Sequence, residues 1–329
     1  MTDNTPDIVE EAEAAVSALA EVKAQIGKAI FGQERVVELS ICAVLAGGHA
    51  LLIGAPGLAK TRLIKAMSTA LGLEGARIQF TPDLMPSDIL GSEVLDETAS
   101  GERSFRFLKG PIFTQLLMAD EINRASPRTQ SALLQAMQER HVTVAGMRHD
   151  LPAPFHVLAT QNPIEQEGTY PLPEAQLDRF LLKIDVSYPA LDVERQILVS
   201  TTGGAEDAPQ AALEPGQLIG LQALVRKMPV GEKVLDAILK LVREARPEQT
   251  SDDRVRSLVD WGPSPRAGQA LMLAARARAL VRGRLAPSLE DVEALAEPAL
   301  GHRMAMRYDP TGEAPSLSAL IEDLASKAA

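Results

Sequence analysis

The sequence predicts an α/β protein in which a five-stranded parallel sheet lies between helices and is followed by an all-helical domain. Short apolar runs alternate with helical patterns over the first 189 residues, as in sheets covered by helices on both faces. After Tyr188-Pro189 only helical patterns remain. Aromatic residues are 3% of the chain, which disfavours an all-β fold. We therefore expect an α/β domain over 1–189 and a helical domain over 190–329, with a flexible connection at about 201–215.

Two helices precede the first predicted strand. Apolar residues spaced three and four apart predict an amphipathic helix over 9–30, and Gly47-Gly48 ends a second helix over 34–46. The apolar run Ala50–Ile53 is bounded by glycines and predicts a buried strand. A glycine-containing loop and a helix over 60–71 follow it.

Four further strands complete the predicted sheet, over 76–80, 115–119, 155–160 and 181–186. Ser126-Pro127 is a typical helix start, and the helix is expected to reach about Arg140. Two segments interrupt the alternation. Residues 81–110 separate the second and third strands, and residues 141–154 hold two short runs around Ala145-Gly146 that predict a β-hairpin.

The region after residue 189 shows apolar residues at helical spacing throughout. Ser288, before Leu289-Glu290-Asp291, is a plausible capping residue for one of these helices. Helices are expected near 191–200, 217–227, 231–245, 265–283, 288–300 and 315–327.

Charge and cysteine content limit the classes of partner and compartment. The net charge is −11, whereas proteins that bind duplex DNA are usually basic, because phosphate neutralisation supplies much of their affinity. Cys42 is the only cysteine and is expected to be buried, so a reducing compartment fits. The apolar window 41–59 is interrupted by glycines and a proline, which argues against a membrane span. The acidic segment 1–13 lacks the apolar run of a signal peptide, and we expect a cytoplasmic protein.

The strongest motif lies between the first strand and the helix that follows it. Glycines let backbone N–H groups turn toward phosphates, and a helix N-terminus adds partial positive charge. Lys60 is placed to reach the β- and γ-phosphates, and Thr61 to hold Mg²⁺. Ala59 stands where the general pattern has glycine, but its methyl group is small. The predicted phosphate loop comprises Gly54, Ala55, Pro56, Gly57, Leu58, Ala59, Lys60 and Thr61.

Two carboxylates follow the third predicted strand. Asp120 and Glu121 stand at its carboxyl end, where ligands of parallel α/β sheets bind. Asp120 is predicted to hold the Mg²⁺ shell, and Glu121 to polarise the attacking water. An apolar run before Asp-Glu is weak evidence alone, and about 60 residues after a phosphate loop it becomes strong.

Three more residues are candidates for the chemistry. Asn162, at the end of the fourth strand, could orient water, although Asn162-Pro163 could also form a simple turn. Arg179 and Arg266 could stabilise charge on a transferring phosphoryl group, or be ordinary surface charges. Arg179 should lie at the far edge of its own domain, which suggests that it serves the next subunit.

Together these motifs resemble the AAA+ ATPases and, within them, the MoxR family, over nearly the whole chain. Residues 54–61 resemble the Walker A motif, and Asp120–Arg124 resembles Walker B with its continuation. Residues 159–163 resemble sensor 1, residues 172–180 the arginine-finger stretch and 265–267 sensor 2. The segments 81–110 and 141–154 resemble the helix-2 insert and the hairpin before sensor 1. Ile30, Phe31 and Gly32 look like the segment that lies against adenine.

The resemblance implies a Mg²⁺-dependent ATPase that forms a ring, usually of six subunits, with nucleotide at the subunit junctions. It also implies chaperone-like work on protein complexes, often metalloenzymes, with a partner that carries a von Willebrand factor A domain. Two other motors of the same clade stay open: a nucleic-acid motor and a chelatase-type subunit. A scaffold that binds nucleotide without hydrolysis is disfavoured by the intact set of Lys60, Asp120, Glu121, Asn162 and Arg179. Whether Arg266 acts on the nucleotide of its own subunit or of a neighbour stays open as well.

Overall fold

The computed structural model describes residues 8–97, 103–164, 168–203, 207–309, 312 and 314–329. Its main feature is a five-stranded parallel sheet with the strand order β2-β5-β8-β1-β9. The structure confirms the five predicted strands, each displaced by no more than a residue at its ends. They are β1 Ala50–Ile53, β2 Gly75–Gln79, β5 Leu116–Asp120, β8 His156–Gln161 and β9 Leu182–Asp185.

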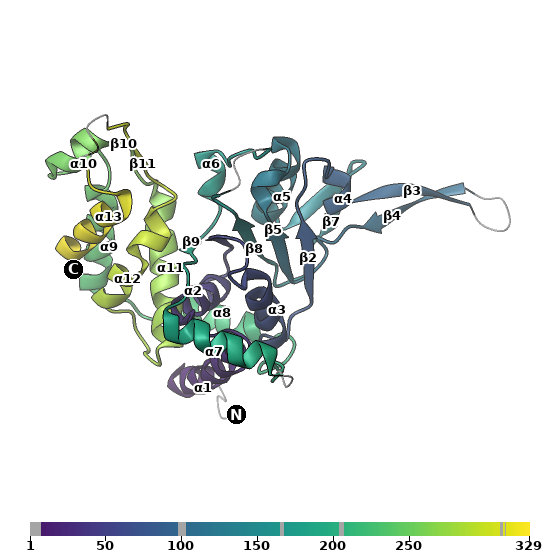
Figure 1. Cartoon of the computed structure of the whole chain (residues 1–329), viewed down its shortest axis with the longest axis horizontal. Helices are drawn as coiled ribbons and strands as arrows, with labels where there is room; N and C mark the ends of the chain where they lie inside the picture. Colours follow the sequence, from purple (N-terminus) through teal and green to yellow (C-terminus); the bar gives the residue numbers. More distant parts are fainter. Residues whose placement is uncertain (1–7, 98–102, 165–167, 204–206, 310–311, 313) are drawn as a thin grey trace, which may run out of the picture.

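Helices cover both faces of this sheet, as predicted (Figure 1). Ala50 and Leu52 point to the face that is covered by α1, α2 and α3, whereas Leu51, between them, points to the face covered by α5. This alternation follows from the two-residue repeat of a strand, and it explains why the strand sequence is apolar throughout. The helices are α1 Ile8–Gly27, α2 Glu34–Leu45, α3 Lys60–Ala70 and α5 Pro127–Glu139.

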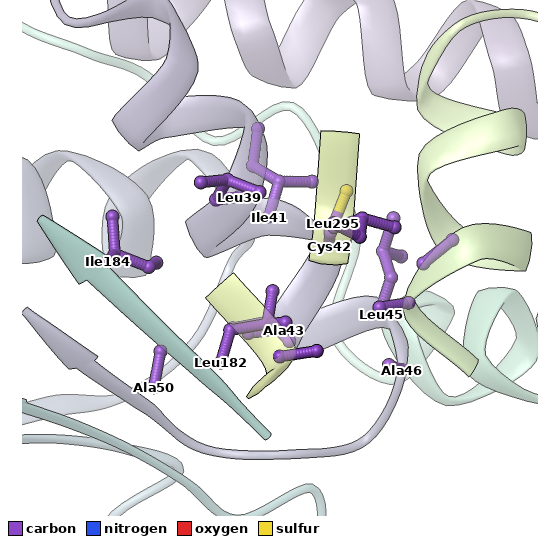
Figure 2. Packing of buried hydrophobic residues seen from close by; sticks show 14 of the residues in the cluster. Leu39, Ile41, Cys42, Ala43, Leu45, Ala46, Ala50, Leu182, Ile184 and Leu295 are labelled. Carbon is purple, nitrogen blue, oxygen red and sulfur yellow. The ribbon is translucent and has the colours of Figure 1, made fainter. Parts of the chain in front are cut away.

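Helix α2 is the most deeply buried of these helices. Figure 2 shows its residues Ile41, Cys42 and Leu45 packed between the sheet and the C-terminal helices. Cys42 is fully buried, as expected, and burial raises the pKa of its thiol, so it packs as a small apolar side chain.

The first interrupting segment forms a ribbon that the sequence pattern did not predict. It contains α4 Pro86–Leu90 and the antiparallel strands β3 Gly91–Glu97 and β4 Arg103–Lys109, which project far from the body (Figure 1). The second segment is the predicted hairpin, with β6 His141–Val144 paired to β7 Met147–Asp150. Short helical turns at Ile122–Arg124 and at α6 Glu174–Leu177 complete this part of the chain.

The C-terminal region is helical, as predicted, with two additions: the short helix α10, over Asp253–Leu258, and one pair of strands. A short antiparallel pair, β10 Val259–Trp261 and β11 Ala305–Met306, joins segments that are distant in sequence. Strands of two and three residues are too short to show an alternating pattern, which is why the sequence predicted only helices here. The helices are α7 Leu191–Thr202, α8 Gln217–Lys227, α9 Glu232–Glu244, α10 Asp253–Leu258, α11 Pro265–Val281, α12 Leu289–Leu300 and α13 Leu317–Ala328.

A buried ionic cluster ties the C-terminal helices to α2. The guanidinium of Arg278 on α11 donates to Glu38 on α2 at 2.9 Å and to Asp291 on α12 at 2.6 Å. All three side chains are almost fully buried, so the loss of Arg278 would leave each of the two buried carboxylates with only one other arginine, Arg282 or Arg284. One apolar cluster also runs from α1 and α2 into α11 and α12. The domain boundary near residue 189 therefore stays a prediction.

The fold holds three histidines in the neutral form. Burial lowers the pKa of His49 to about 3 and that of His156 to about 4, and it brings the pKa of His302 well below 6.5. Hydrogen bonds assign the ring nitrogens of His49, because Nε2 donates to the Met137 carbonyl at 3.2 Å and Nδ1 accepts from Val157 N–H at 2.9 Å. These rings are packing groups that stay uncharged near neutral pH.

We expect the free energy of unfolding to fall as the pH decreases from about 6.5 to 4. In this window the unfolded chain protonates these histidines and the folded chain does not, so each lowers stability by up to about 1.4 kcal/mol per pH unit. Above pH 6.5 they have no such effect. The His302→Gln variant keeps the donor to the Phe180 carbonyl (3.0 Å in the wild type) without the titrating ring. Urea midpoints across this window should therefore fall less steeply for the variant, and equal slopes would contradict the assignment.

Candidate functional site

The carboxyl ends of the parallel strands bring the predicted phosphate loop and the carboxylates to one edge of the sheet. The pairing of β1 with β8 places Ile53 beside Gln161, and Gly54 N–H donates to the Gln161 carbonyl at 3.3 Å. On the next strand, Asp120 ends β5. The loops that follow β1, β5 and β8 therefore open on the same side, as expected for a nucleotide site.

The loop between β1 and α3 has the backbone geometry of a phosphate cradle. A side chain at Gly54 would meet the Val186 carbonyl oxygen at 2.6 Å, so this position requires glycine. Gly57 has φ +82° and faces open space, and Ala59 has φ +56°, a left-handed conformation that alanine adopts at a cost of about 1 kcal/mol. No side chain caps the first turn of α3, so its N–H groups are available to an anion. This arrangement fits a polyphosphate.

Lys60 lies at the start of α3, close to both carboxylates. Its Nζ donates to the carbonyls of Gly54 at 2.5 Å and Ala55 at 3.1 Å. Partial burial lowers its pKa, and the charges of Asp120 and Glu121 oppose that shift. The ammonium of the lysine and the two carboxylates thus form one cluster of charges beside the loop.

Asp120 is buried and held by two donors. Its Oδ1 accepts from Thr160 Oγ1 at 2.6 Å, and its Oδ2 accepts from Arg77 Nη2 at 2.7 Å. Thr160 Oγ1 also accepts from Glu121 N–H at 2.9 Å, so this hydroxyl links the end of β5 to β8. A carboxylate fixed in this way is suited to holding a divalent cation through its hydration shell. Thr61, exposed at the start of α3, could act with it.

Glu121 stands in a strained conformation at the end of β5. Its φ is +55°, which is unusual for a residue other than glycine, and such conformations are frequent at functional sites. Its Oε2 accepts from Gln79 Nε2 at 2.8 Å and from Arg124 Nη1 at 3.1 Å. Arg77 Nη2 also donates to Gln79 Oε1 at 2.6 Å, so the two carboxylates share one network of polar side chains.

Sequence reasoning missed Arg77, Gln79 and Arg124 as members of this site. Arg77 and Gln79 are two residues apart on β2, so their side chains share one face of the sheet. The two-residue repeat of this strand was therefore a signal in the sequence that the two side chains lie together. Only the order of the strands shows that β2 is paired with β5, with Gln79 beside Asp120.

The remaining residues predicted for the nucleotide lie beside the loop. Asn162 is buried directly after β8, and its Oδ1 accepts from Ile164 N–H at 3.1 Å, which is the simple turn also considered from the sequence. Gln33 Nε2 donates to the Leu58 carbonyl at 3.1 Å, which joins the segment after Ile30 to the loop. Ile30 is buried and Phe31 is half-buried. A side chain at Gly32 would collide with Val193 of α7.

Arg179 and Arg266 lie together at the amino-terminal ends of the strands, opposite the ends that carry the phosphate loop. Leu181 N–H donates to the His49 carbonyl at 2.8 Å, just before β1 and β9 begin. Both arginines line a cavity of about 260 Å³ there, with Gly47 and Asp178. The four residues of β1 separate this cavity from Gly54, which is about 13 Å at 3.3 Å per residue. The structure therefore does not place these arginines beside Lys60 and the carboxylates of the same chain.

Arg303, which the sequence did not single out, fixes the position of this arginine pair. Its side chain is almost fully buried; Nε donates to Asp178 Oδ1 at 2.6 Å, and Nη2 donates to the Phe180 carbonyl at 2.7 Å. Asp178 Oδ2 in turn lies 3.7 Å from Arg266 Nη1. The turn that follows α12 thus anchors the stretch that carries Arg179 and, through Asp178, the start of α11.

Comparisons with known proteins agree with this geometry. Residues 49–182 match the family "ATPase family associated with various cellular activities (AAA)", and residues 251–324 match the "AAA lid domain". No helix among the described residues is long and apolar enough to span a membrane.

Two curated relatives and one solved structure are similar over most of their length. The chain is 43% identical to Chaperone MoxR1 of Mycobacterium tuberculosis, over 87% of this chain and 75% of that protein. It is 33% identical to Protein MoxR of Paracoccus denitrificans, over 89% of this chain and 91% of that one. A crystal structure of a Cytophaga hutchinsonii protein, 35% identical, superposes with a TM-score of 0.88 over 97% of both chains. The chain therefore belongs to the MoxR family of AAA+ ATPases, enzymes that hydrolyse ATP to ADP and phosphate.

Proposed function

We propose that this ATPase works as a ring, of six subunits by family resemblance, that remodels partner proteins in the cytoplasm in a chaperone-like role. The observation that carries the proposal is the separation of the arginines from the phosphate loop. Arg179 and Arg266 share a cavity at the amino-terminal ends of the strands, whereas Lys60 and Glu121 lie at the carboxyl ends. An ATPase that needs both groups at one nucleotide must combine two copies of this chain.

The residues at the carboxyl edge take complementary roles in this proposal. The backbone N–H groups of residues 57–61 hold the phosphates, and Lys60 extends its ammonium to the β- and γ-phosphates. Thr61 and Asp120 hold Mg²⁺, which when bound neutralises charge on the phosphates. Glu121 orients the attacking water, while Gln79 and Arg124 keep its carboxylate in place. The segment Ile30–Gly32 lies against adenine.

Asn162 acts with Glu121 on the attacking water in this proposal. It directly follows β8, whose Thr160 already hydrogen-bonds both Asp120 and the Glu121 backbone, so the amide stands close to the carboxylates. Its turn-forming hydrogen bond engages Oδ1, and Nδ2 is the group that would face the γ-phosphate.

Arg179 and Arg266 serve the nucleotide of the neighbouring subunit. Asp178 and Arg303 act as positioning residues, because they fix the backbone and side chains around the two arginines without reaching a nucleotide themselves. Such an arrangement couples hydrolysis to the subunit interface. A change of nucleotide state at one site then shifts the population of the neighbour's conformations, and this shift performs mechanical work on a bound partner.

The client is proposed to be a protein, with a von Willebrand factor A domain partner and metalloenzyme complexes as the candidates by family resemblance. The projecting β3–β4 ribbon supports a protein client, because Leu95 and Phe105 form an exposed apolar pair across its strands. A nucleic-acid motor is disfavoured by the β6–β7 hairpin. Its Arg148 is paired with Asp150 at 2.8 Å, so its charge is partly offset.

The proposal is tested by ATPase activity measured against protein concentration, with sedimentation velocity in the same buffer. We expect the turnover per subunit to rise with concentration as monomers assemble, because an isolated monomer lacks the arginines at its own nucleotide. Equal turnover at all concentrations, with a monomer in the centrifuge, would show that each chain contains a complete site and would exclude a shared one.

A further inference from the structure

The helix α7 carries a stripe of apolar side chains that faces away from its own subunit. Leu191, Leu198 and Val199 are 80%, 64% and 70% exposed. Leu198 and Val199 stand seven and eight residues after Leu191, about two helical turns on, so all three side chains lie on one side of the helix. Val193, on the opposite side, lies against Gly32. The stripe is therefore apolar surface that the subunit itself does not cover, and it lies beside the proposed adenine segment.

A matching groove lies on the C-terminal helices. It has a volume of about 680 Å³, and α9 and α11 form its walls, with the apolar side chains of Leu235, Leu239 and Met272 among the lining. Leu239 is 52% exposed. Three arginines, Arg226, Arg243 and Arg246, also line the groove, and no acidic residue does. It is suited to an apolar helix flanked by carboxylates.

The charges of the two surfaces are complementary. Asp192 and Glu194 flank the apolar stripe of α7 on either side, according to the 100° turn per residue of a helix. Arg195 lies within the stripe, so the face carries two negative charges and one positive charge. The long aliphatic part of Arg195 can pack while its guanidinium stays in water.

The position of the groove relative to the arginines decides which molecule fills it. Gln269 and Leu273 of α11 line both the groove and the cavity that holds Arg179 and Arg266. A neighbour that brings these arginines to the nucleotide also brings its groove to that side of the site. On the receiving chain, α7 packs on Gly32 through Val193, so the stripe lies on the side of the nucleotide site that this groove would approach.

We propose that the apolar stripe of α7 docks into the groove between α9 and α11 of the adjacent copy of this chain. The inference rests on the shared nucleotide site proposed above and names the contact that holds the shared site together. The contact joins two different surfaces, so it repeats from one copy to the next and can close into a ring.

Two aspartate variants test the contact by sedimentation velocity. Leu198→Asp alters the stripe, Leu239→Asp alters the groove, and both side chains are exposed, so the monomers should fold, which circular dichroism would check. We expect each variant alone to need at least about tenfold more protein than the wild type to assemble, because a buried charge removes an apolar contact at the interface. Leu285→Asp, at a leucine that is 39% exposed between α11 and α12, is the matched control and should assemble normally.

A mixture of the two variants gives a sharper test. The unaltered stripe of the Leu239→Asp chain can enter the unaltered groove of the Leu198→Asp chain, whereas the reverse contact is damaged on both sides. The mixture should therefore form heterodimers with one working nucleotide site, at concentrations where neither variant associates alone. If both variants assemble like a wild type that does form rings, α7 does not dock there and the shared site stands without it. If the wild type itself never assembles, the shared site and the docking contact both fail.

Discussion

Replacing Glu121 with glutamine is expected to lower kcat for ATP hydrolysis by about 10²–10⁴-fold, the usual contribution of a positioned general base. The carboxylate is held by Gln79 and Arg124 at the end of β5, where the backbone of Glu121 is left-handed. Glutamine has the same shape and can still accept from Gln79, but it cannot take a proton from water. Phosphate release measures turnover, and titration with a fluorescent nucleotide measures affinity.

Nucleotide affinity separates this role from a structural one. Glu121→Gln should bind ATP about as well as the wild type, because the phosphate loop and Lys60 are unchanged. Lys60→Ala is the contrasting variant and should weaken binding itself, since it removes the charge proposed to face the phosphates. A Glu121→Gln protein that keeps turnover within tenfold of the wild type would show that another group activates the water.

Arg179→Ala is expected to reduce kcat by about 10³–10⁵-fold, the range measured for arginine fingers, with little change in nucleotide affinity. The physical reason is the loss of a guanidinium that stabilises charge on the transferring phosphoryl group. Arg307→Ala is a suitable control, because Arg307 is a half-exposed arginine of the helical region whose guanidinium lies 3.8 Å from Asp260, on the short β10–β11 pair. It should keep wild-type turnover.

Mixing the two inactive variants distinguishes a neighbour's arginine from the chain's own. In a mixed ring, a junction is intact when it combines Glu121 of an Arg179→Ala chain with Arg179 of a Glu121→Gln chain. Random mixing of equal amounts leaves about a quarter of head-to-tail junctions intact, so turnover should rise to about that fraction of the wild-type value. If the arginine acted within its own chain, every site of the mixture would carry one defect and turnover would stay at the level of the variants.

The sequence by itself determined the half of the site that is proposed to bind the nucleotide. Residues 54–61 and the pair Asp120-Glu121 form continuous motifs, and the apolar runs around them predicted five strands that the structure confirms. Such features are local, because backbone turns, helix caps and the repeat of a strand or helix depend on residues close together in the chain. Parallel pairing of those strands then implied that the motifs meet at one edge of the sheet.

Only the tertiary structure decided how the other residues join that site. Gln79 reaches Glu121 because β2 lies next to β5, and Arg303 reaches Asp178 across 125 positions of sequence. The grouping of Arg179 with Arg266, and the exposure of the α7 stripe, likewise depend on how the C-terminal helices pack against the sheet. These contacts join residues that are far apart in the chain, so no short pattern of residues could predict them. Their positions follow from the packing of the whole core.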